Sequence, residues 1–157
     1  EKIRISRIFN FLDELGTDLG ALWGEVGGLD SQAPGPKNLK KYGFLHRRSI
    51  KIFKKNGNVT GIDTLIKKNN IQNNADYSIR FHIYPGISTV QTVSGKSILL
   101  QISRNKSWIF LSEGQDLQIE KGLFLGRNKI LNNHCIVIYG KAENQNTDIK
   151  WELKKSS

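Results

Sequence analysis

Two short segments of the sequence carry ionisable side chains at alternating positions, where they would share one face of a β-strand. His46 and Arg48 are two residues apart, and Arg80, His82 and Tyr84 alternate in the same way. A histidine can bind a metal or exchange a proton, and an arginine grips a carboxylate or a sulfate with a fork of N–H donors. These residue types therefore predict anion binding in both segments.

A structural interpretation stands beside each of these predictions. His46 and Arg48 share their face with Ile50 and Ile52, so they can equally be hydrogen-bonded residues of a core or a sheet edge. The Arg80 segment can instead pack against a second sheet or a neighbouring domain. If the functional interpretation holds, the residues that bind substrate are Arg47, Arg48, Arg80, His82 and Tyr84.

Motifs of a self-contained enzyme are missing from the sequence. The three histidines, His46, His82 and His134, form no pair at metal-ligand spacing, and there is no phosphate-binding glycine loop, nucleophile elbow or CxxC. Cys135 is the only cysteine, so no intrachain disulfide can form, and its apolar neighbours indicate a buried structural thiol. We predict no catalytic residue within this chain.

The charge balance is strongly basic. Lysine and arginine number 24 against 14 acidic residues, a formal net charge of +10 in 157 residues. Such a surface favours polyanions such as acidic polysaccharide, anionic lipid or nucleic acid, although lysines can also serve only solubility. No apolar run of about 18 residues is present, so we expect no membrane-spanning helix.

The hydrophobic pattern has the period of β-strands almost throughout. The segment 77–84 alternates strictly, and Asn56-Gly57 and Pro85-Gly86 are turn signals. Short runs at a spacing of about ten residues predict an all-β, antiparallel β-sandwich of about ten to twelve strands. Trp108 and Trp151 alternate with apolar residues and are predicted to lie in the core.

The chain is predicted to be one domain over 1–157, cut from a longer protein. It opens on Glu1-Lys2-Ile3-Arg4-Ile5-Ser6, already an alternating pattern, without an initiator methionine. An apolar run at 19–26 and a proline-containing loop at 31–38 precede the regular pattern that begins near Tyr42.

Several segments, taken in order, resemble the carboxy-terminal domain of heparinase II/III family proteins. Gly43-Phe44-Leu45-His46-Arg47-Arg48 is similar to the family's Gly-x-x-His-x-Arg strand, and the stretch 56–65 to its Asp-Gly, Gly-x-Asp-x-Leu hairpin. Ile79-Arg80-Phe81-His82-Ile83-Tyr84-Pro85 is similar to its Arg-Phe-His-hydrophobic-His-Pro run, with Tyr84 in place of the last histidine. The resemblance covers roughly residues 40 to 155.

The resemblance implies a supersandwich-like domain of a polysaccharide lyase, secreted or periplasmic in a bacterium. In such enzymes an amino-terminal helical toroid and a β-sandwich grip a uronate polymer, for example a glycosaminoglycan, between them. A Tyr/His pair then carries out β-elimination. That pair would lie outside this chain, so the fragment alone is expected to be inactive. A structural zinc or calcium ion, shared with the missing part, is also implied, with His46 as one ligand.

Two other functions remain open from the sequence. A non-catalytic carbohydrate-binding or adhesion module has the same all-β pattern. A nucleic-acid-binding domain is permitted by the charge, but the sequence lacks a recognition-helix pattern and a clear exposed aromatic platform, which disfavours nucleic acid as the partner.

Overall fold

The computed structural model describes residues 3–8, 43–53, 55–68, 75–126, 129–143 and 145–156, and their regular structure is entirely β-strand. The strands are β1 (Ile3–Ile8), β2 (Phe44–Ile52), β3 (Val59–Lys67), β4 (Ala75–His82), β5 (Ser88–Gln91), β6 (Ser97–Ser103), β7 (Lys106–Ser112), β8 (Leu117–Gly126), β9 (Lys129–Ala142) and β10 (Thr147–Lys155). No described helix could cross a membrane. The predictions for the run at 19–26 and for the loop at 31–38 lie outside the described residues.

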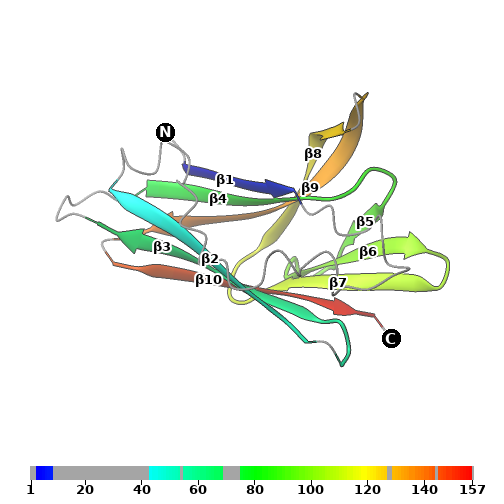
Figure 1. Ribbon diagram of the computed structural model, residues 1–157, viewed down its shortest axis with the longest axis horizontal. Coiled ribbons are helices and arrows are strands. Elements are labelled where there is room, and N and C mark those ends of the chain that lie inside the picture. The colour runs from blue at the N-terminus through cyan, green and yellow to red at the C-terminus, as the bar shows by residue number, and fades with distance from the viewer. Residues whose placement is uncertain are drawn as a thin grey trace.

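The strands form two sheets that face each other, which confirms the predicted β-sandwich. One sheet has the order β1-β4-β9-β8, and the other has the order β2-β3-β10-β7-β6-β5. Figure 1 shows β1, β4 and β9 in a layer above β3 and β10. We call these the four-stranded sheet and the six-stranded sheet.

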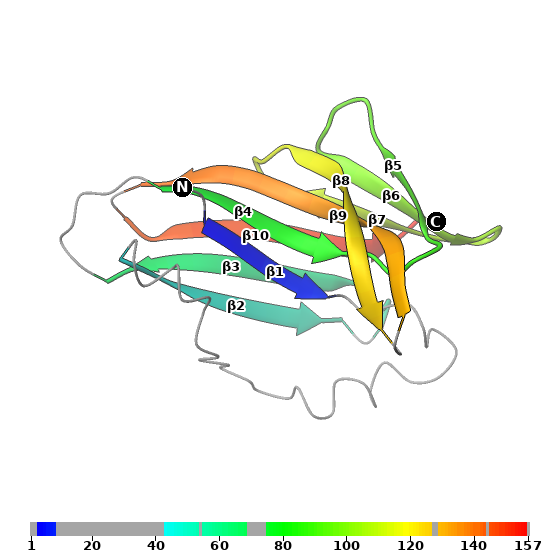
Figure 2. The same cartoon turned by 90° about the horizontal axis from the view of Figure 1, so that it is seen from above.

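Two details differ from the sequence prediction. The described pairings are antiparallel except that β1 runs parallel to β4, which is possible because a long stretch of chain separates the two strands. The strand β9 spans the 14 residues Lys129–Ala142 and is longer than the short strands that the sequence predicts. The polar first half of β9 is also strand, because it pairs with β8 as far as Gly126↔Lys129. The pairing of β9 with β4 stops earlier, at His82↔Cys135. Figure 2 shows β8 and β9 running on together beyond β4.

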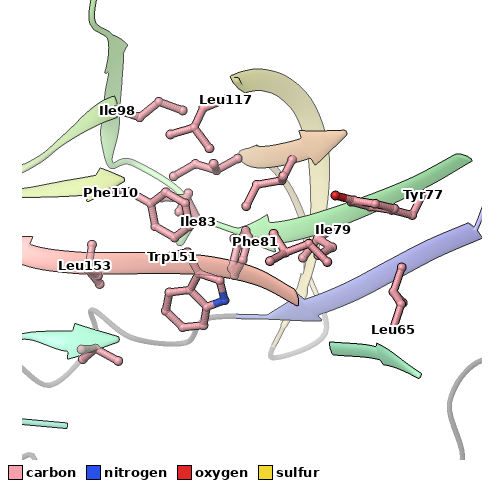
Figure 3. Packing of buried hydrophobic residues seen from close by; sticks show 14 of the residues in the cluster. Leu65, Tyr77, Ile79, Phe81, Ile83, Ile98, Phe110, Leu117, Trp151 and Leu153 are labelled. Carbon is pink, nitrogen blue, oxygen red and sulfur yellow. The ribbon is translucent and has the colours of Figure 1, made fainter. Parts of the chain in front are cut away.

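The core lies between the two sheets and is built from the inward face of each strand. Ile79, Phe81 and Ile83 are buried, as their alternation predicts, and Trp108 and Trp151 are only 0% and 3% exposed. The Phe81 ring lies 4.8 Å from the ring of Phe110 and 5.1 Å from that of Trp151, centroid to centroid. Figure 3 shows these rings meeting between strands of opposite sheets. The aromatic contacts therefore join the two layers.

Gly61 is the residue that makes room for the Trp151 indole. The two residues are direct partners across β3 and β10, and a Cβ atom on residue 61 would overlap Cζ2 of Trp151. We expect Gly61→Ala to lower the free energy of unfolding by about 1–3 kcal/mol, because the indole must shift in a packed core. Urea unfolding measures this loss. In a Trp151→Phe background the smaller ring should reduce the cost of Gly61→Ala, and an undiminished cost would contradict this explanation.

Candidate functional site

A cluster of charged and polar side chains lies buried between the sheets around Asp63. The Asp63 side chain is fully buried, and its Oδ1 atom accepts hydrogen bonds from Nε2 of His46 (2.5 Å) and Nε of Arg48 (2.6 Å). Its Oδ2 atom accepts a hydrogen bond from Nε1 of Trp151 (2.8 Å). We call these four residues the Asp63 cluster. These three N–H groups all donate to the one carboxylate, which a buried carboxylate requires.

The strand register explains how the cluster forms. Arg48 and Asp63 are direct partners across β2 and β3, and His46 stands two residues from Arg48 on the same face. Trp151 reaches Asp63 from β10, on the other side of β3. Three neighbouring strands of the six-stranded sheet therefore contribute to the cluster.

The carboxyl group of Asp63 is ionised. Burial by itself raises its pKa, but the hydrogen bond from His46 and the charge and hydrogen bond of Arg48 outweigh burial, so that the pKa lies below its ordinary value of 3.8. The Arg48 guanidinium also lies over the Phe81 ring, 5.0 Å from its centroid, and Phe81 belongs to the opposite sheet. The cluster thus ties the edge strand β2 to both layers.

A second polar cluster lies on the outer face of the four-stranded sheet. Arg80 forms an ion pair with Glu120 (2.7 Å), and Tyr139 donates a hydrogen bond to the same carboxylate. Nδ1 of His82 lies 3.2 Å from Sγ of Cys135. Burial, followed by the charge of Arg80, lowers the pKa of His82, which favours a neutral imidazole. Cross-strand neighbours on β4, β8 and β9 thus satisfy these groups.

The five predicted substrate-binding residues lie in three separate places. Arg48 is buried in the Asp63 cluster, with 7% of its side chain exposed, and Arg47 is exposed on the opposite face of β2. Arg80 and His82 lie on the outer face of the four-stranded sheet, and Tyr84 follows at the end of β4, where its ring contacts Phe124 at 5.3 Å. The structure therefore brings three of the five together and leaves the other two on a different sheet.

Sequence reasoning did not identify Asp63 as a site residue. It lies in the Gly61-Ile62-Asp63-Thr64-Leu65 stretch, which the resemblance covers, at an inward position between Gly61 and Leu65. A lone carboxylate on an apolar face needs partners, and this is the signal from which a buried ion pair could have been predicted. The described residues contain no group of three or more His, Cys, Asp or Glu side chains that could hold a metal ion.

Cys135 is buried, as predicted, and we expect it to be unreactive in the folded protein. It is 1% exposed, and burial raises its pKa, so little thiolate is present near neutral pH. A colorimetric disulfide reagent should therefore label it at a negligible rate without denaturant and fully in urea. Fast labelling of the folded protein would contradict the burial of the outer face around Cys135.

Three comparisons with known proteins bear on what the chain is. The profile of the family "Heparinase II/III-like, C-terminal" matches residues 26–152. The fold is similar to that of heparan sulfate lyase HepC from Pedobacter heparinus and of a mutant of that enzyme, each with a TM-score of 0.62 and 13% sequence identity. Each likeness covers 73% of this chain but 18% of the HepC chain, so this chain spans about a fifth of that protein.

A search among curated protein sequences gives no match. The family profile nevertheless extends over most of the chain, from before β2 into β10. The resemblance noted in the sequence is therefore confirmed: this chain belongs to the heparinase II/III-like C-terminal domain family.

Proposed function

We propose that this chain is the β-sandwich part of a heparinase II/III-like polysaccharide lyase and supports β-elimination on an acidic polysaccharide that contains uronic acid. The family match over residues 26–152 is the observation that carries the proposal. The net charge of +10 suits a polyanionic substrate. In this proposal the protein acts in the bacterial periplasm or outside the cell.

The chemistry of β-elimination would come from another part of the parent protein. The reaction needs a base for the proton α to the uronate carboxylate, an acid for the leaving oxygen, and a group that neutralises the developing charge. Among the described residues, His46 and Arg48 are bonded to Asp63, and Arg80 is bonded to Glu120. We therefore assign the acid–base pair to an amino-terminal helical toroid, and to this chain the support of one wall of the cleft.

Exposed cations on β2 are the best candidates for contact with the polymer. Arg47 and Lys51 are exposed and lie on the same face of this edge strand, whereas Arg48 is turned inward and Arg80 is neutralised by Glu120. A regularly charged polymer can bind along such a strand by exchanging its counterions for these side chains. Tyr84 and Phe124, half-buried beside each other, lie at the four-stranded sheet and would offer a separate aromatic surface for a sugar ring.

The test compares binding and catalysis. The chain alone should give no unsaturated uronate, measured by ultraviolet absorbance, from heparan sulfate, heparin, chondroitin sulfate or alginate, while the parent protein should give it from at least one. Arg47→Ala/Lys51→Ala should elute from immobilised heparin at lower salt than a control with the same charge loss, Lys96→Ala/Arg104→Ala, at two exposed positions elsewhere.

Other outcomes favour other functions. Cleavage by the chain alone, or no cleavage by the parent protein, would refute the proposal. Binding of an acidic glycan by the chain with the affinity of the parent protein would support a carbohydrate-binding module. Steeply salt-dependent binding to random DNA, without binding to uronic glycans, would support a nucleic-acid-binding domain.

A further inference from the structure

The geometry points to Arg48 as a built-in cation: we propose that its guanidinium occupies the place where a metal ion would otherwise neutralise Asp63, and that the Asp63 cluster holds no metal. The resemblance implies a structural zinc or calcium ion in some sandwiches of this type, with His46 as one ligand. Whether a metal ion fits beside His46 can be judged from the distances between the surrounding side chains and from the hydrogen bonds that they already make. This inference does not depend on the proposed function.

The distance between the two best candidate ligands leaves no room for a metal ion. Nε2 of His46 and Oδ1 of Asp63 are 2.5 Å apart. A tetrahedral zinc ion about 2.0–2.2 Å from a nitrogen and from an oxygen holds those two atoms roughly 3.4 Å apart. A contact of 2.5 Å is instead a hydrogen bond, and an imidazole nitrogen that donates its N–H to a carboxylate has no lone pair for a metal.

Both oxygens of Asp63 already accept hydrogen bonds from the protein. Arg48 donates to Oδ1 at 2.6 Å and Trp151 donates to Oδ2 at 2.8 Å, so both oxygens already face N–H groups. The guanidinium supplies the positive charge that a metal would bring, and it is held in place between Asp63 and the rings of Phe81 and Trp151. Its Nη2 atom is buried without a hydrogen-bond partner, so this guanidinium is enclosed rather than solvated.

Removal of this cation should turn the cluster into a metal site. The substitution Arg48→His places a second imidazole two residues from His46 on the same strand face, opposite Asp63 in the β2–β3 register. Two imidazoles and one carboxylate are a common ligand set for zinc. Arg47→His is the matched control, because it makes the same change on the exposed opposite face of the same strand.

The experiment measures metal content, thermal midpoint and the visible spectrum with cobalt for the full 157-residue chain. The unaltered chain and Arg47→His should contain far less than one equivalent of zinc or calcium, and neither chelator nor added metal should move their midpoints. Arg48→His should show a cobalt d–d band, and its midpoint should rise by about 5–10 °C in zinc at about 100 times the dissociation constant.

Two results would overturn the proposal. One is that the unaltered chain binds an equivalent of metal and that removal of this metal lowers the thermal midpoint. This result would overturn the proposal even if Arg48→His did not fold. The other is a folded Arg48→His protein without any response to cobalt or zinc, since the arginine would then not occupy a cation position.

Discussion

Asp63→Ala is expected to lower the free energy of unfolding by about 3–5 kcal/mol. The substitution leaves the Arg48 guanidinium buried without its counter-ion and removes the acceptor of the Trp151 indole. Domains of this size have roughly 5–15 kcal/mol of stability in all, so much of it would be lost. Urea unfolding followed by tryptophan fluorescence measures the change.

Two controls separate the effect of losing the ion pair from the effect of replacing any aspartate. Asp63→Asn keeps the shape but not the charge, and it should cost nearly as much because Arg48 stays buried and unpaired. Asp76→Ala, at an exposed position of β4, should change the free energy by about 0.5 kcal/mol or less. If Asp63→Asn were as stable as the unaltered chain, the buried charge would not stabilise the fold.

The same carboxylate predicts the response to acid. Because the pKa of folded Asp63 is lowered, its contribution is fully present above its ordinary value of 3.8 and is lost as the pH falls through the lowered pKa. The stability difference between the unaltered chain and Asp63→Asn should therefore be constant near neutral pH and shrink only below 3.8. A difference that vanished between pH 5 and 7 would contradict the lowered pKa.

Phe81→Ala is expected to lower the free energy of unfolding by about 3–5 kcal/mol, because it opens a cavity rather than because it leaves a charge unpaired. Phe81 is fully buried, contacts Phe110 and Trp151 on the opposite sheet, and lies beneath the guanidinium of Arg48. Alanine would leave a cavity at the point where both sheets and the Asp63 cluster meet. The cost is again read from urea unfolding, and a loss of cooperativity would show the two layers separating.

Phe53→Ala is the matched control for this substitution. Phe53 is 38% exposed just after β2, and Lys51 lies over its ring, so we expect Phe53→Ala to lower the free energy of unfolding by about 1 kcal/mol or less. The loss in free energy of unfolding for Phe81→Leu should lie between those for Phe81→Ala and Phe53→Ala, because leucine retains much of the buried apolar area. Equal losses for Phe81→Ala and Phe53→Ala would mean that the contacts of Phe81 with the opposite sheet stabilise the fold no more than an exposed ring does.

The strand pattern was predictable in much of the chain because it depends on neighbouring residues alone. Alternation placed Ile79, Phe81 and Ile83 on an inward face, and the turns at Asn56-Gly57 and Pro85-Gly86 are where Gly57 and Gly86 adopt positive φ values of 73° and 89°. The same alternation put His46 and Arg48 on one face and Arg47 on the other. The resemblance to the family also came from the sequence, since it depends on the order of local motifs.

The partners of those side chains were decided only by the tertiary structure. His46 and Arg48 meet Asp63 across a hairpin, and Asp63 meets Trp151 across 88 positions of the sequence. Alternation fixes the face of a strand but says nothing of its neighbour or its register, which depend on how whole sheets pack. The same is true of the one carboxylate that His46 and Arg48 share, because the pairing of β2 with β3 places it beside them.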